Sequence, residues 1–228
     1  MKKSITYLLI AIVLLAIPFG YAAYLYPSLP EKIPTHFNIK GEADAFGGKD
    51  SIFIGPGILG ATGLFTFFLI SNIKYFDPKR YKTEDEGMFK KFALFMVGFL
   101  SALGIIITYS ATGTNAKSTE ETVNITKILL PFIGIAFALM GWFMPRLQQN
   151  YFAGFKLPWT LENVDNWNET HKVAGKVWFY GGLAQAIATF ILPTEAGIVT
   201  FLAIVLVMII IPTVFSYRMF KNGNQIKL

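Results

Sequence analysis

Hydrophobic positions along the chain gather in six long runs that are separated by polar segments. Asp and Glu are absent from all six runs, and Lys stands only near the ends of two of them. A helix of about 20 apolar residues crosses a hydrocarbon core of about 30 Å. The pattern therefore predicts an all-α polytopic membrane protein with six transmembrane helices at about residues 5–26, 52–73, 92–111, 125–144, 173–192 and 198–217.

Two of the polar segments are long enough to carry structure of their own. Residues 27–51 contain three leading prolines and several glycines, which indicates turns and a short hairpin. Residues 145–173 are rich in aromatic side chains. We expect two units: residues 1–73 with two spans and the structured loop 27–51, and residues 74–228 with four spans and the loop 145–173.

The first apolar run follows Lys2 and Lys3, as in a secretory signal peptide. The run is longer than the usual apolar region of such a peptide, of about 7–15 residues, so we favour an uncleaved anchor. Pro18 within the run predicts a kink, because proline lacks the amide hydrogen that a helix uses.

Charge orients the chain in the membrane. Of the 20 Lys and Arg residues, 15 fall on the side of the two termini and of loop 145–173, and 5 fall on the other side. Basic residues accumulate on the cytoplasmic side of membrane proteins. Both termini and loop 145–173 are thus predicted to be cytoplasmic, and loop 27–51 extracellular. This bias accounts for the net charge of +6 without a direct nucleic-acid partner.

Several kinds of chemistry lack the residues they need. The chain has no cysteine, and its two histidines, His36 and His171, fall on opposite sides of the predicted membrane. Ion-coupled transporters usually place carboxylates or histidines within the membrane, and here Gln185 is the most polar side chain deep in a span. We therefore disfavour a transporter, expect no enzyme, and expect no cofactor and no resident metal.

Loop 27–51 nevertheless gathers polar side chains. One interpretation is a metal or ligand site made by His36, Glu42 and Asp44. The other is a polar loop whose histidine bonds to its own turns, and we favour it, because one histidine with two carboxylates is a weak zinc signal.

Loop 145–173 offers a similar choice. Trp167 and His171 are four residues apart, so they share one face of a helix that Thr160 or Asn163 could cap. That face either packs at the membrane boundary, as aromatic belts do, or docks a partner. From the residues alone we favour packing.

The aromatic loop resembles the signature of the SdpI family of bacterial membrane proteins, in which an arginine is common at the position of Lys156. The matching residues are Asn150, Gly154, Lys156, Pro158, Trp159, Thr160, Trp167, His171 and Gly175. The outer loop is similar to the small domain of unknown function that often precedes that signature, at Leu29, Pro30, Ile33, Pro34, His36, Phe37, Asn38, Gly41, Asp44 and Lys49.

The resemblance implies a multi-pass protein of the bacterial plasma membrane that confers immunity to a secreted peptide or protein toxin. It also implies a signalling role, in which a cytoplasmic transcriptional repressor of the ArsR type is sequestered at the membrane. The expected toxin-facing residues are His36, Asn38, Glu42, Asp44 and Lys49. The expected partner-facing residues are Asn150, Gly154, Lys156, Pro158, Trp159, Thr160, Trp167 and His171. The alternatives are a small-solute transporter or channel and a membrane enzyme with its site in the outer loop.

Overall fold

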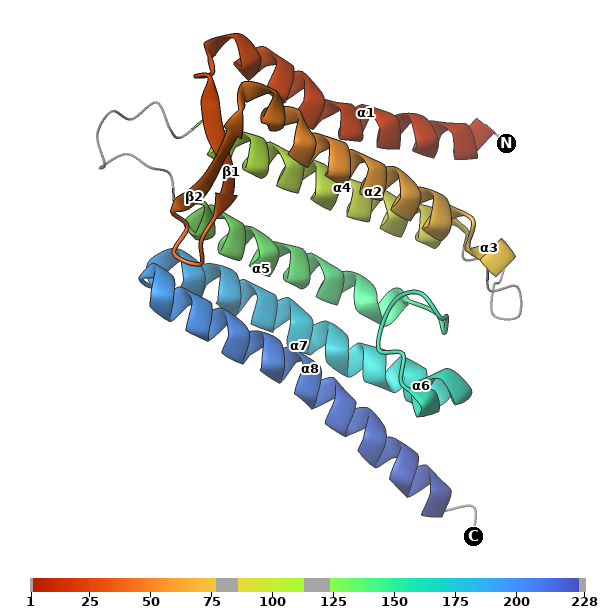
Figure 1. Cartoon of the computed structure of the whole chain (residues 1–228). Helices are drawn as coiled ribbons and strands as arrows, with labels where there is room; N and C mark the ends of the chain where they lie inside the picture. The colour runs from red at the N-terminus through yellow and green to blue at the C-terminus, as the bar shows by residue number, and fades with distance from the viewer. Residues whose placement is uncertain (1, 77–85, 113–123, 226–228) are drawn as a thin grey trace. The chain divides into compact units, whose positions relative to one another are not determined.

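The computed structural model describes residues 2–76, 86–112 and 124–225. These residues form long helices and one small hairpin (Figure 1). They group into two compact units, Met1–Ile73 with Glu86–Leu129 and Lys74–Asp85 with Leu130–Leu228. The division into residues 1–73 and 74–228 as functional domains stays a prediction.

Five stretches of the described chain are long and apolar enough to cross a membrane, which agrees with the predicted all-α polytopic fold. They are Ile5–Ser28, Lys49–Ser71, Gly87–Ser110, Ile125–Arg146 and Thr194–Asn222. Helix α7 (Val164–Ile191), which contains the predicted fifth span, is not among the five. It includes Lys176, Gln185 and Thr189, which lower its apolar character. The count of six spans stays a prediction.

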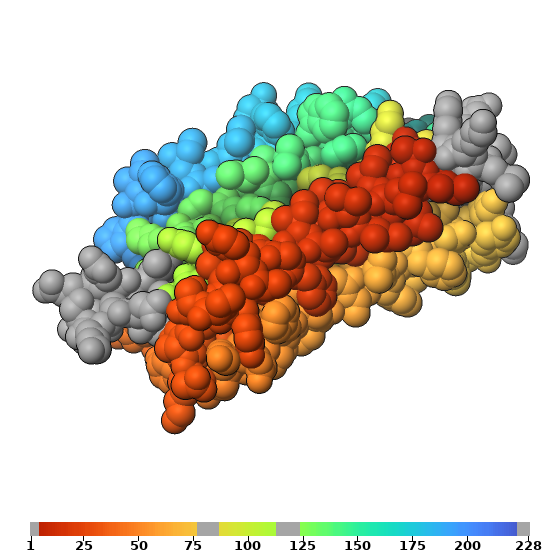
Figure 2. Space-filling model, turned by 90° about the horizontal axis from the view of Figure 1, so that it is seen from above, coloured from red at the N-terminus to blue at the C-terminus, as the bar shows by residue number. Residues whose placement is uncertain are grey.

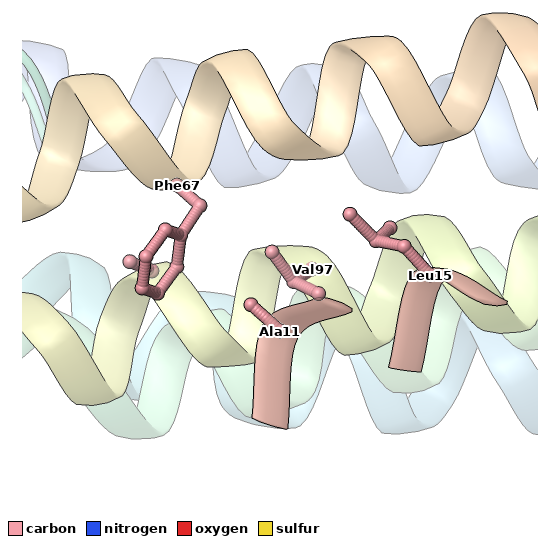
Figure 3. Packing of buried hydrophobic residues seen from close by; sticks show 5 residues of the cluster. Ala11, Leu15, Phe67 and Val97 are labelled. Atoms are coloured by element: carbon pink, nitrogen blue, oxygen red, sulfur yellow. The ribbon is translucent and has the colours of Figure 1, made fainter. Parts of the chain in front are cut away.

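Three helices form the core of the first unit: α1 (Lys2–Leu25), α2 (Ile54–Ser71) and α4 (Glu86–Ser110). Ala11 and Leu15 of α1, Phe67 of α2 and Val97 of α4 point toward one another (Figure 3). In the space-filling view α1 lies along α2 (Figure 2). Helix α4, which the sequence placed with the following spans, packs here against α1 and α2.

The predicted hairpin is present in loop 27–51, which the charge pattern predicts to be the outer loop. Strand β1 (Lys32–Phe37) pairs antiparallel with β2 (Ala43–Gly48), with Lys32 opposite Gly48 and Phe37 opposite Ala43. Short helical turns flank it, η1 (Tyr26–Ser28) and η2 (Lys49–Phe53). A buried cluster fastens the hairpin to the helix ends through Ala22, Leu29, Ile33, Ile52 and Ala111. The cluster therefore holds the hairpin in place against the ends of the helices.

The second unit contains residues 130–143 of α5 (Ile125–Phe143), η4 (Met144–Arg146), α6 (Pro158–Glu162), α7 and α8 (Thr194–Gln225). Helices α7 and α8 lie side by side (Figure 1). Helix α5 approaches α7 backbone to backbone: a Cβ atom placed on Gly141 would lie 2.4 Å from the amide nitrogen of Phe179. Small residues at such contacts are typical of membrane helix packing.

Prolines inside two helices leave carbonyl groups that neighbouring helices satisfy. Pro18 in α1 cannot donate to the carbonyl of Leu14, and the Ser101 hydroxyl of α4 donates to that oxygen at 2.5 Å. Pro212 in α8 cannot donate to Met208, and the indole N–H of Trp178 in α7 donates there at 3.0 Å. In hydrocarbon an unpaired backbone group costs several kcal/mol, so each donor stabilises its helix pair.

Candidate functional site

Residues 147–163 fold back on the first turns of α7, and Trp167 holds them there. Its side chain is 0% exposed. The indole N–H donates to the carbonyl of Leu147 at 2.7 Å. A buried tryptophan contributes a large apolar surface, and here its polar atom is also paired. Trp167 is thus a packing residue at the base of the loop.

His171 joins the same buried site one helical turn further on. Its ring stacks on Trp167 with centroids 4.0 Å apart and an interplanar angle of 22°. Nε2 accepts the amide hydrogen of Phe155 at 3.0 Å. Because that amide can only donate, the ring proton is on Nδ1, which donates to the carbonyl of Trp167 at 2.7 Å. The imidazole is therefore neutral and bridges α7 to the loop.

Burial lowers the pKa of the His171 imidazole from 6.5 to about 4. The hydrogen bond to Trp167 has a smaller effect, which raises the pKa. Both side chains are buried, so Trp167 and His171 pack, as the residues alone favoured, and present no exposed docking face in this structure. A role of these residues in partner binding stays a prediction, and it would require the loop to open.

Glycine is required at two positions of the signature. Gly154 has φ +107°, a conformation that L side chains rarely adopt. A Cβ atom placed there would lie 2.2 Å from Nε2 of His171. A Cβ atom on Gly175 would lie 2.6 Å from Cγ of Pro145. The glycines therefore let the loop and η4 approach α7.

Asn150 and Thr160 shape the loop from within, and both are buried. Oδ1 of Asn150 accepts the amide hydrogens of Phe152 and Ala153, each at 2.8 Å, and its amide group donates to the carbonyl of Gln148 at 2.7 Å. The Thr160 hydroxyl oxygen accepts the amide hydrogen of Leu157 at 2.9 Å. These side chains replace the backbone hydrogen bonds that an irregular loop lacks.

The remaining signature residues lie at the surface. Lys156 and Pro158 are exposed. Trp159 is half-buried: its indole N–H donates to the Ser216 hydroxyl at 3.0 Å, and its ring stacks on Phe220 with centroids 5.7 Å apart. Trp159 thus ties α6 to α8 while part of its ring stays accessible.

Asn166 and Thr170 are two further buried residues of this site, which the sequence analysis did not predict. The Asn166 side-chain amide donates to the carbonyl of Ser216 at 3.0 Å, and its oxygen accepts the Thr170 hydroxyl at 3.1 Å. Asn166 and Thr170 precede Trp167 and His171 by one position each, so the two pairs line one broad helix face. The same spacing of four residues in both pairs was the signal in the sequence that could have revealed Asn166 and Thr170. The predicted cap is confirmed at Asn163, whose side chain accepts the amide hydrogen of Asn166 at 2.9 Å.

The outer hairpin forms a separate candidate site in the first unit. Nδ1 of His36 lies 2.5 Å from Oδ1 of Asp44, with the two side chains 68% and 44% exposed. The Asn38 amide donates to the Glu42 carboxylate at 2.9 Å. The hairpin therefore joins four of the five predicted toxin-facing residues in two pairs across its turn.

The fifth residue, Lys49, lies beyond β2 at the other end of the hairpin. Its Nζ is 3.8 Å from the Glu31 carboxylate and 5.2 Å from the Tyr26 ring centroid. Within the described ranges, no group of three or more His, Cys, Asp or Glu side chains could hold a metal ion.

Long apolar helices, a two-stranded hairpin and an aromatic loop folded onto α7 define a polytopic membrane protein with two candidate contact surfaces. Residues 146–216 match the model of the SdpI/YfhL protein family, and residues 13–60 match a domain of unknown function, DUF1648. Residues 146–216 thus match the SdpI family that the motifs resemble, and the chain is a multi-pass protein of the bacterial plasma membrane.

One curated relative matches nearly end to end. The chain is 27% identical over 224 residues to "Immunity protein SdpI" of Bacillus subtilis (strain 168), across 98% of this chain and 99% of that protein. No solved structure matches the chain.

Proposed function

We propose that this chain is an immunity protein, which protects the bacterium that makes it from a secreted peptide or protein toxin. The observation that carries the proposal is the end-to-end similarity to an immunity protein, which spans both the hairpin and the aromatic loop. Protection would rest on binding and not on catalysis.

The outer hairpin is the surface that suits a toxin. A buried cluster fastens it to the helix ends, so little conformational entropy would be lost when it binds. Its exposed side chains include the His36–Asp44 pair and the apolar Ile39 and Phe46. A rigid mixture of charged and apolar groups is the composition of many peptide-binding surfaces.

Deletion of the gene tests the proposed function. The deletion strain and its parent are exposed to culture media of neighbouring bacterial strains, and survival is compared. We expect at least one medium to inhibit the deletion strain only, and a plasmid copy of the gene to restore survival. Equal survival in every medium would argue against immunity, and solute flux through the protein in liposomes would then favour the transporter.

We further propose that the cytoplasmic loop docks a soluble partner, which by resemblance to the family is a transcriptional repressor of the ArsR type. The accessible part of the signature is Lys156, Pro158 and the outer edge of Trp159. A lysine beside an exposed aromatic edge suits an acidic patch on a partner. Lys156→Glu should abolish co-purification of the repressor, whereas the exposed but distant Glu195→Lys should retain it. Equal co-purification with both variants would exclude this surface.

A further inference from the structure

A groove of about 460 Å³ runs between the end of α5 and the middle of α7, within the second unit. Its floor is formed where Gly141 and Gly175 bring the two backbones together. Its walls carry Trp142, Arg146, Lys176 and Tyr180. Neither the immunity function nor the proposed repressor surface uses this groove.

Two cations from different segments converge on the groove. The Arg146 guanidinium lies over the Trp142 ring, 4.1 Å from its centroid, and donates to the Trp142 carbonyl. The ring therefore fixes the position of the Arg146 charge. Lys176 comes from α7 and is exposed. The residues that line the groove include no acidic side chain. The groove is therefore positively charged and favours an anion.

The residues around the groove indicate that it lies at the depth of lipid headgroups. The apolar stretch Ile125–Arg146 ends at Arg146 itself. Trp142 and Tyr180 are 51% and 68% exposed beside it. Aromatic side chains gather at the boundary between hydrocarbon and headgroups, and basic grooves between transmembrane helices suit acidic headgroups.

We propose that this groove binds the phosphate headgroup of an anionic phospholipid. Arg146 and Lys176 contact the phosphate oxygens, and the exposed faces of Trp142 and Tyr180 lie along the glycerol and the first acyl carbons. The mostly apolar wall favours a lipid over a soluble anion, because a free phosphate would gain nothing from the aromatic faces.

Native mass spectrometry of the full chain in detergent tests the proposal, with phosphatidylglycerol and phosphatidylcholine as probes. We expect the protein to retain phosphatidylglycerol preferentially. Lys176→Gln should weaken that binding about fivefold, because each basic residue near a headgroup contributes about that factor. Arg146→Gln together with Lys176→Gln should remove the preference. Arg218→Gln with Lys221→Gln, which removes equal charge from α8, should retain it.

Other outcomes would overturn the proposal. Equal retention of both lipids by the unaltered protein would exclude a headgroup site. Equal losses in the Arg146/Lys176 and Arg218/Lys221 pairs would indicate unspecific attraction of charge. Displacement of the bound phosphatidylglycerol by inorganic phosphate would assign the site to a free anion. Lys176 is exposed, so the single variant should fold and give a result even if loss of Arg146 disturbs the loop.

Discussion

Nε2 of His171 occupies the space that a side chain on Gly154 would need. A Cβ atom at residue 154 would lie 2.2 Å from it, and the backbone there has φ +107°. The loop can therefore close on α7 only if position 154 lacks a side chain. The two residues, 17 positions apart, form one structural unit of the family signature.

Gly154→Ala should destabilise the protein by about 2–3 kcal/mol. Backbone strain contributes about 1–2 kcal/mol and the displaced hydrogen bond of His171 about 1 kcal/mol. Thermal unfolding in detergent measures the change. Gly48→Ala is the control, because a Cβ atom there meets nothing within 4 Å, and it should leave the unfolding temperature nearly unchanged. Equal effects would contradict the close approach of Gly154 to His171.

Acid should weaken the closed loop through His171. Its pKa is about 4 in the folded protein and about 6.5 when exposed, so between these values the open state binds the extra proton. The stabilising contribution of neutral His171 is complete above pH 6.5 and is lost as the pH falls toward 4. The total is about 3 kcal/mol.

Nuclear magnetic resonance of the imidazole ring measures this pKa directly. The chain has two histidines, so His36→Gln leaves a single signal. We expect its titration midpoint near pH 4. A midpoint near 6.5 would mean that His171 is exposed to water and that the loop is open.

Trp167→Ala should cause aggregation or degradation, because removal of a buried tryptophan costs about 3–5 kcal/mol. Trp167→Phe keeps most of the apolar surface but leaves the Leu147 carbonyl unpaired, which costs about 1–3 kcal/mol. Membrane abundance and monodispersity in detergent distinguish the two variants. If Trp167→Ala were stable and monodisperse yet lost a cytoplasmic partner, docking by Trp167 would be favoured instead.

The outer hairpin should tolerate loss of its His36–Asp44 pair without loss of fold. His36 and Asp44 are largely exposed, so His36→Ala or Asp44→Ala should leave membrane abundance unchanged. If the pair contacts the toxin, each variant should lower the tolerated toxin concentration about five- to tenfold, as expected for contact residues worth 1 kcal/mol or more. Lys32→Ala, exposed on the same strand, is the control. Reduced abundance would indicate a structural role.

Topology can be measured with single cysteines, because the chain has none of its own. Cysteine at the exposed Lys32 should react with an impermeant reagent in intact cells, and cysteine at the exposed Glu162 should react only after lysis. The reason is the 15 to 5 division of basic residues. Labelling of position 162 from outside would reverse the predicted orientation.

Hydropathy predicted the bounds of a helix well where the whole helix is apolar. The span expected at residues 125–144 appears as Ile125–Phe143. The apolar run predicted at residues 173–192 covers only the later part of α7, because the first turns of that helix, which Asn163 caps, are polar and pack against a loop. The spacing of Trp167 and His171 revealed a shared helix face but could not show what covers it. The cover is segment 147–163, which is irregular apart from the short helix α6 and has no periodicity to detect.

The proline-bearing helices α1 and α8 differ in when their missing hydrogen bond can be replaced during synthesis. Trp178 precedes Met208 by 30 residues, so α8 enters the membrane with its donor already made. Ser101 follows Leu14 by 87 residues, so α1 must wait for α4 while its carbonyl faces lipid or another transient partner. Of these two helices, α1 is thus the one that depends longer on a chaperone or insertase for its unpaired carbonyl. Ser101→Ala should prolong that dependence, whereas Trp178→Phe should act only after α8 has been made.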